Sequence, residues 1–440
     1  MKKLINKDMR HSNLNSGLFH CIPIAGIVIL MFIFVSCDGI LDVDNPNSLV
    51  EEDINNPAAA DGLANGALAT TMRGIGYIYA ANSTVTDEVR WTGSRDNWND
   101  LSLGRVADFN NEFIDWSWPF ITEARWTSDL AINQLNELRS EGTLPRESDL
   151  ARAYLYSSLI RTVIAEVHED FVYSDRRDPG TPFGPNNMDQ MFAEAINNLG
   201  EALTIAQNVD GSAGIELQRK ILGLRARVHH ARAVRASLTP RGSSPANPLI
   251  NDTAARADAL AALDLMSEDY KWILDFSSAQ VNNQFSSEVV SRGELTILES
   301  FDDPITNEQD PRMEEIRADF YDASSYGETH APITVISARE MHLIIAEADL
   351  ANSPEDARTR LNMLRSLNNL PPIEAGNNLI EMLIHERRAN LFVQGKRLND
   401  LYRFDIKAPE WETSSSAYTE TGLLFPIPIQ ERRANPNISQ

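Results

Sequence analysis

Apolar residues recur every three or four positions through most of the chain, the spacing that places them on one face of an α-helix. The clearest case is the segment 152–167, where Leu155, Leu159 and Val163 follow one another at intervals of four. The same pattern predicts helices over Ala58–Met72, Arg152–Val167, Met188–Ala206, Ile215–Ala236, Ser337–Ala351, Pro354–Leu367 and Asn378–Phe392.

These helices are separated by short turns, and such pairs are typical of a helical-repeat protein. Ala202, Ala226 and Ala357 lie where a tetratricopeptide-like repeat needs small packing residues. No strict repeat of sequence identity accompanies them. The sequence therefore predicts an all-α fold with a degenerate, tetratricopeptide-like helical-repeat scaffold.

Two polar, irregular regions interrupt the helical pattern, at residues 84–115 and 275–334. Long segments of this kind inside a folded domain are usually functional, because connecting segments carry binding residues on a rigid scaffold. We call them the first and the second insertion.

The N-terminus has the composition of a lipoprotein signal peptide. A basic start is followed by an apolar run over residues 22–35 and by Ser36 and Cys37. The run is too short for an ordinary membrane span, so we expect a signal peptide over 1–36 and an acylated Cys37. The alternative is an uncleaved anchor. A tether over 37–50 and a single domain over 51–440 complete the expected organisation.

The charge excludes one class of partner. The formal net charge is −24, with 63 acidic against 39 basic side chains. Such a chain is not expected to bind nucleic acid through phosphate contacts, nor to attract anionic ligands over long distances. A neutral sugar or peptide is compatible with it.

The C-terminal part carries the most specific motifs, HERRANLFVQGKRLNDLYR at 385–403 and FPIP at 425–428, followed by Glu431 and the Asn-Pro-Asn of 435–437. This region resembles the closing segment of the SusD/RagB family of surface glycan-binding lipoproteins. Asn390 and Gln394 depart from that family's pattern, which has acidic residues at both positions. The segments 152–156, 224–227, 340–348 and 361–365 resemble further helices of the family.

The resemblance implies a non-enzymatic protein, lipid-anchored at the outer membrane and facing the exterior. It would capture an oligosaccharide or polysaccharide and pass it to a TonB-dependent transporter of the SusC type. Three alternatives stay open: a peptide-binding uptake protein, an adaptor whose repeats bind only protein, and an enzyme such as a glycosidase that uses a pair of loop carboxylates.

A neutral-sugar site requires a flat aromatic ring with polar side chains at its edge. We expect such a site in the first insertion, unless its two tryptophans are buried, with weaker candidates in the second. Trp116, Trp118 and Trp126 lie among apolar residues and are interpreted as core. The candidates are Trp91, Arg95, Asn97, Trp98 and Asn99, followed by Phe285, Tyr321 and Tyr326.

The sequence gives no catalytic residue, metal ligand or cofactor motif that stands out. The polar cluster of Glu166, His168, Glu169 and Asp170 has no second histidine or cysteine pair close by, as a metal site would need. The charged residues of the C-terminal motif are interpreted as an internal ion-pair lattice that holds two helices together: Glu386, Arg388, Arg397, Asp400 and Arg403.

Overall fold

The computed structural model describes residues 56–174, 178–321 and 329–438. All of them belong to the unit Glu52–Gln440, and the remaining unit is Met1–Glu51. The expected signal peptide, Cys37 and the tether thus lie outside the described residues. None of the described helices combines the length and the apolarity needed to cross a membrane.

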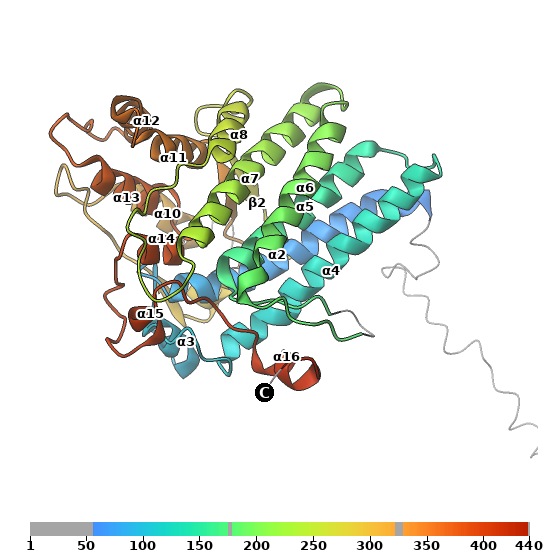
Figure 1. Ribbon diagram of the computed structural model, residues 1–440, viewed down its shortest axis with the longest axis horizontal. Helices are drawn as coiled ribbons and strands as arrows, with labels where there is room; N and C mark the ends of the chain where they lie inside the picture. The colour runs from blue at the N-terminus through green and yellow to red at the C-terminus, as the bar shows by residue number, and fades with distance from the viewer. Residues whose placement is uncertain (1–55, 175–177, 322–328, 439–440) are drawn as a thin grey trace, which may run out of the picture. The chain divides into compact units, whose positions relative to one another are not determined.

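The first half of this unit is a row of long helices, each of which packs against the next. Figure 1 shows α2, α4, α5, α6 and α7 lying side by side, with α8 following at one end. A one-turn 3₁₀ helix, η2 (Pro57–Ala59), precedes the row, and η3 (Pro185–Asn187) precedes α6. The helices are α2 (Ala60–Thr84), α4 (Glu112–Ser140), α5 (Glu147–Val167), α6 (Asp189–Ala206), α7 (Gly211–Ser237) and α8 (Thr253–Leu263).

The second half continues the packing with shorter helices. The first of them, α11, packs against α8, α12 and α13, and α14 contacts α2 and α7. They are α11 (Ala338–Asp349), α12 (Pro354–Ser366), α13 (Leu379–Asn390), α14 (Arg397–Arg403), α15 (Ser416–Thr419) and α16 (Ile429–Ala434).

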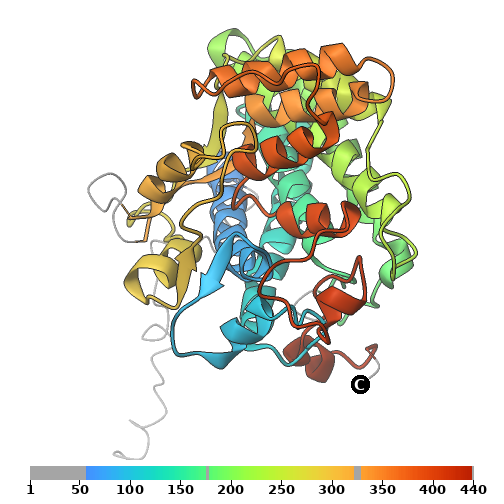
Figure 2. The same ribbon diagram turned by 90° about the vertical axis from the view of Figure 1, so that its left-hand side faces the viewer.

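Four short strands form two antiparallel pairs in the described residues. In the first pair, β1 (Val89–Trp91) lies beside β3 (Leu295–Ile297), with Trp91 opposite Leu295. In the second, β2 (Lys271–Leu274) lies beside β4 (Ile333–Ser337). The first pair joins the two insertions, which are far apart in the sequence. Figure 2 shows β1 and α3 (Asp96–Ser102) on the same side of the unit as the yellow and gold segments of the second insertion.

The expected fold class is confirmed: the described chain is mostly helical, with little sheet. The expected helices are present, although α2 extends twelve residues beyond the predicted end at Met72. One long helix, α4, was not predicted. It carries Pro119 in its interior and contacts α2 on one side and α5 on another, so its apolar residues do not form a single stripe.

The second insertion is attached to the helices by a buried ion-pair network. Arg365 on α12 donates from Nη1 to Asp303 Oδ2 at 2.7 Å and to Glu386 Oε1 at 3.0 Å. Arg312, at the start of α10 (Arg312–Tyr321), donates to Asp310 Oδ2 and to Glu386 Oε2, both at 2.6 Å. All five side chains are at most 1% exposed. We call this set the anchor network.

A second buried network joins α11, α13 and α14. Asp400 accepts hydrogen bonds from Nε of Arg387 and Nε of Arg403, each at 2.9 Å. Glu347 accepts from His230 at 3.0 Å and pairs with Arg403. Although burial opposes its charge, Arg403 and His230 hold the pKa of Glu347 well below its usual range.

The expected ion-pair lattice is therefore present, and it reaches further than two helices. Arg388 and Arg397 both pair with Asp87, at 3.0 and 2.7 Å, so the C-terminal motif also holds the start of the first insertion. Glu386 holds the second insertion through Arg312. The most specific motif of the sequence is thus the part of the fold that fixes both insertions in place.

Candidate functional site

Glu294 of the second insertion binds the first insertion directly after β1, through both its backbone oxygen and its carboxylate. Glu294 Oε2 accepts hydrogen bonds from the backbone nitrogens of Ser94 at 2.9 Å and Arg95 at 3.0 Å. Its Oε1 accepts from the Ser94 hydroxyl at 2.9 Å. Because four successive residues, 92–95, are bonded to Glu294, the loop that ends in Arg95 has a fixed course.

The expectation that Trp98 offers a ring to a sugar is corrected by its burial. Its side chain is 2% exposed and stacks on Phe113, with ring centroids 3.5 Å apart and planes 11° from parallel. Its indole nitrogen donates to Glu288 Oε2 at 3.3 Å. Trp98 therefore connects the first insertion to α4 and to the π-helical turn η4 (Ser287–Ser291) of the second insertion.

Two of the three candidates in the second insertion contact other parts of the protein. Phe285, in α9 (Gln284–Ser286), is fully buried against Phe320, and this corrects its expected ligand role. Tyr321 is 39% exposed, and its hydroxyl accepts a hydrogen bond from Ile297 N on β3 at 3.2 Å. Tyr326 lies outside the described residues.

The remaining candidates of the first insertion are all half-buried and differ in what they contact. Asn97 Oδ1 accepts from the backbone nitrogen of Glu112 at 3.1 Å, so Asn97 holds the first turn of α4. Trp91 is half-buried on β1, and its indole nitrogen is buried without a partner in the described chain. Asn99 is half-buried within α3. Arg95 is the candidate whose side chain reaches a half-buried aromatic surface.

That surface is built from Tyr77 on α2 and from Trp116 and Phe120 on α4, three half-buried rings that we call the aromatic shelf. Tyr77 stacks on Phe120 with centroids 4.1 Å apart and meets Trp116 edge-on at 4.9 Å. No described residue makes a hydrogen bond with the Tyr77 hydroxyl or the Trp116 indole nitrogen, and neither atom is buried.

The close approach of α2 and α4 makes this stacking possible. A Cβ on Gly74 would lie 3.2 Å from the backbone oxygen of Phe120, which is tighter than ordinary contact. Glycine at this position therefore lets the two backbones approach one turn before Tyr77. Trp116 and Phe120 are four residues apart on α4 and share a face.

Three guanidinium groups surround the shelf, each from a different segment. Arg292, from the end of η4, lies 5.5 Å from the centroid of Trp116, and Arg95 lies 5.8 Å from the same ring. Arg73 on α2 lies 5.8 Å from the centroid of Phe120. The first insertion, the second insertion and the helical scaffold thus each supply one cation to the same aromatic surface.

Burial shifts the pKa values of two ionisable groups at the shelf, Glu288 and Tyr77. Burial raises the pKa of Glu288, and hydrogen bonds from Gln284 and Trp98 oppose that rise. Burial also raises the pKa of Tyr77 against the effect of Arg73 and Arg292, so its hydroxyl stays protonated at neutral pH. The shelf can therefore offer ring faces, a phenol, an indole N–H and guanidinium N–H groups to a ligand.

Of the tryptophans interpreted as core, Trp118 belongs to it, and Trp116 packs against it while part of its side chain stays accessible. Trp118 is buried and its indole nitrogen donates to Glu431 at 3.2 Å, whereas Trp116 and Trp126 are half-buried. The spacing of Phe113, Trp116 and Phe120 would have indicated one aromatic helix face, had α4 been predicted.

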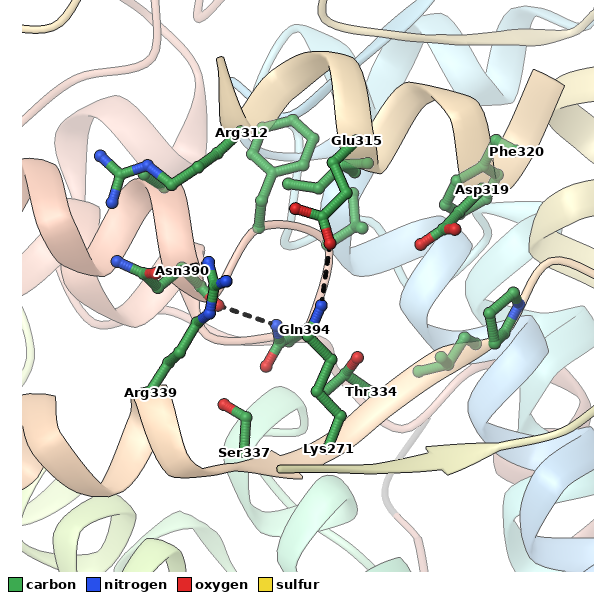
Figure 3. Close-up of a pocket in the computed structure, with 16 residues that line it drawn as sticks. Lys271, Arg312, Glu315, Asp319, Phe320, Thr334, Ser337, Arg339, Asn390 and Gln394 are labelled. Carbon is green, nitrogen blue, oxygen red and sulfur yellow. Dashed lines mark hydrogen bonds and ion pairs between the residues drawn. The ribbon is translucent and has the colours of Figure 1, made fainter. Parts of the chain in front are cut away.

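A small hollow lies between α10, β4 and the end of α13 (Figure 3). Its volume is about 70 Å³, well below the roughly 300–1,000 Å³ of ordinary ligand pockets. Asn390 and Gln394, the two departures from the family pattern, both line it. Asn390 Oδ1 accepts from Arg339 at 3.3 Å and its Nδ2 donates to Glu386 Oε2 at 3.1 Å, so the amide connects Arg339 to the anchor network.

Two larger hollows adjoin at Glu169 and Pro185, with volumes of about 310 and 440 Å³. Phe183 is the one aromatic residue among their lining side chains, and it packs edge-on against Tyr173. Their size would admit a ligand, but they have no aromatic surface comparable to the shelf.

Two carboxylates of the anchor network form a group of potential metal ligands with the neighbouring His385. Ligand atoms of Asp303, His385 and Glu386 lie within 4.8 Å of one another. Arg365 binds both carboxylates and Arg312 binds Glu386, so a cation would have to displace two guanidinium groups. The arrangement favours ion pairs as the support of the second insertion.

Comparison with known proteins shows which family and which solved structures this chain is similar to. Residues 303–416 match the model of the SusD family. A SusD superfamily protein from Bacteroides fragilis superimposes with a TM-score of 0.61 at 16% identity, covering 87% of this chain and 99% of that protein. A SusD-like carbohydrate binding protein from Bacteroides vulgatus gives 0.57 at 13% identity, over 87% and 97% of the two chains.

A SusD homolog from Bacteroides thetaiotaomicron gives a TM-score of 0.58 at 14% identity, with 89% of this chain and 98% of that one covered. No curated protein sequence matches the chain significantly. SusD family proteins are non-catalytic binding proteins.

Proposed function

Because the chain is a SusD/RagB family protein with the fold of that family, we propose that it binds a glycan on the aromatic shelf. The observation that carries the proposal is the group of half-buried rings, Tyr77, Trp116 and Phe120, at the meeting point of both insertions. A sugar ring has an apolar C–H face bordered by hydroxyls. The rings supply area for that face, and the free phenol, indole and guanidinium groups supply hydrogen bonds.

The wider biological role is part of the same proposal. The chain is a lipoprotein, acylated at Cys37 and held at the outer membrane with its domain 51–440 facing the exterior. It passes captured glycan to a SusC-type TonB-dependent transporter. The carbohydrate-binding name of the Bacteroides vulgatus structure supports a glycan as ligand, and the N-terminal sequence supports the lipid anchor.

The experiment is a binding screen of the purified protein against soluble polysaccharides in retention gels, followed by calorimetry with the best ligand. Trp116→Ala is expected to weaken binding about thirtyfold, roughly 2 kcal/mol, because it removes the largest ring of the shelf. The melting temperature of the variant is measured as well, because Trp116 is half-buried and packs against the core, and a loss of binding counts only where the variant stays folded.

Tyr418→Ala is the matched control. Tyr418 is 36% exposed on α15 and lies beside Lys407, so it is an aromatic residue with a nearby cation outside the shelf. Its replacement should leave glycan affinity unchanged. Equal losses in both variants would contradict the proposed site. Binding of peptides in place of every glycan would favour a peptide-uptake role, and binding of neither would favour an adaptor.

A further inference from the structure

The guanidinium groups around the shelf have hydrogen-bonding capacity that the protein leaves unused. Among the described residues, the one side-chain acceptor of Arg73 is Glu123 Oε2 at 3.5 Å, and that of Arg95 is Glu112 Oε1. Arg292 approaches Glu288 Oε1 at 3.5 Å, although Glu288 already accepts from Trp98 and Gln284. Two of these three contacts are longer than a good hydrogen bond.

Two fully buried arginines of the described chain are bonded far more completely. Arg365 donates to Asp303, Glu386 and the backbone oxygen of Pro371, and Arg403 donates to Asp400, Glu347 and the backbone oxygen of Pro248. A guanidinium group carries several N–H donors in a planar fork. Around the shelf, most of those donors face no acceptor among the described residues.

The three arginines around the shelf are also exposed to solvent and lie close to its rings. The side chains of Arg73, Arg95 and Arg292 are 44%, 37% and 44% exposed. Each lies near a ring of the shelf, so a sugar on the rings would be within reach of a guanidinium fork. Each of the three arginines lies beside one carboxylate, of Glu123, Glu112 or Glu288, so the charges around the shelf balance in a chain whose net charge is −24.

We propose that the shelf selects acidic glycans, whose carboxylate or sulfate groups bind the guanidinium groups of Arg95 and Arg292 while the sugar ring lies on Trp116. The selection rests on the proposed glycan-binding function and adds the chemical class of the ligand. Planar, bidentate bonds from arginine to a carboxylate are stronger than bonds to a neutral hydroxyl. The attraction acts at short range, so the negative surface elsewhere does not prevent it.

The test compares oligogalacturonate, a sulfated oligosaccharide and a neutral β-glucan oligosaccharide of the same length, by calorimetry on the purified protein. At least one acidic ligand is expected to bind tenfold or more tightly than the neutral one, and to lose affinity as salt is raised. The double variant Arg95→Gln/Arg292→Gln should lose about tenfold or more for the acidic ligand and little for the neutral one.

Arg432→Gln is the matched control, because Arg432 lies 4.8 Å from the ring of Phe109 in an arginine–aromatic pair that includes no ring of the shelf. Trp116→Ala should weaken every glycan that binds. Neutral binding that is strong, independent of salt and lost in Trp116→Ala would overturn the selection of acidic ligands and leave the glycan site in place. Failure of all three oligosaccharides to bind would overturn both proposals. Comparing the affinities of oligogalacturonate and the sulfated oligosaccharide shows whether the site prefers a carboxylate or a sulfate ester.

Discussion

Replacement of Arg365 by methionine is expected to lower the free energy of unfolding by about 3–5 kcal/mol. Arg365 pairs with Asp303 and shares Glu386 with Arg312, and the side chains of Arg365, Asp303 and Glu386 have no exposed area. Methionine fills part of the space but leaves buried negative charge without its partner. Chemical denaturation with urea, followed by circular dichroism, measures the loss as a lower transition midpoint.

The control for this prediction is Arg73→Met, which breaks an exposed ion pair at 3.5 Å and should cost less than about 1 kcal/mol. A second variant separates lost charge pairing from a poor fit of methionine. Adding Asp303→Asn to Arg365→Met removes one of the two carboxylates left behind, and should recover part of the loss. No recovery would indicate that packing around residue 365, and not the anchor network, sets the stability.

Glu88→Gln is expected to stabilise the protein at pH 8 and to change it much less at pH 5. Glu88 is buried beside Asp87, and burial raises the pKa of its carboxyl from an ordinary value of 4.5 to about 7. Its Oε1 accepts from the backbone nitrogen of Val393 at 2.9 Å, which an amide oxygen can also do.

The direction of this pH dependence follows from the raised pKa of Glu88. The folded protein holds the proton more tightly than the unfolded chain does, so the stability linked to Glu88 is complete below about pH 4.5 and is lost as the pH rises through 7. The advantage of the glutamine variant should therefore grow by about 2–3 kcal/mol between pH 5 and pH 8. Urea midpoints at the two pH values test this.

Glu410→Gln serves as the comparison, because Glu410 is partly exposed and pairs with Arg90 at 3.1 Å. Its effect should be small and similar at both pH values. If the advantage of Glu88→Gln were the same at pH 5 and pH 8, the carboxyl of Glu88 would not titrate in this range. Because Glu88 lies between the end of α2 and β1, the same measurement reports on how firmly the first insertion is held.

The two networks explain why the C-terminal motif is recognisable from its residues alone. Residues 385–403 supply charged groups for ion pairs with both insertions, and each pair needs a particular residue type at a particular place. Such requirements keep spacing recognisable, and the family resemblance inferred from that spacing is confirmed. The charge interpretation of the motif was correct for the same reason.

The sequence by itself determined the helical fold class, most helix positions and the ion-pair role of the C-terminal motif. The helices follow from the local periodicity of apolar residues, and the ion-pair role follows because charged side chains, when buried, pair with opposite charges. It did not determine which aromatic residues are exposed. Trp98 lies among polar residues in the sequence and Trp116 among apolar ones, yet Trp98 is covered by Phe113 and Glu288 while Trp116 is only half-buried.

Only the tertiary structure decided the candidate site, because its parts come from separate segments. Tyr77 belongs to α2, Trp116 and Phe120 to α4, and Arg292 to the second insertion, more than 150 residues further along. Exposure of a ring depends on which distant segment packs over it, and local pattern carries no information about that packing. The β1–β3 pairing and the Glu294 contacts bring the insertions together, and through them the aromatic shelf acquires its arginines.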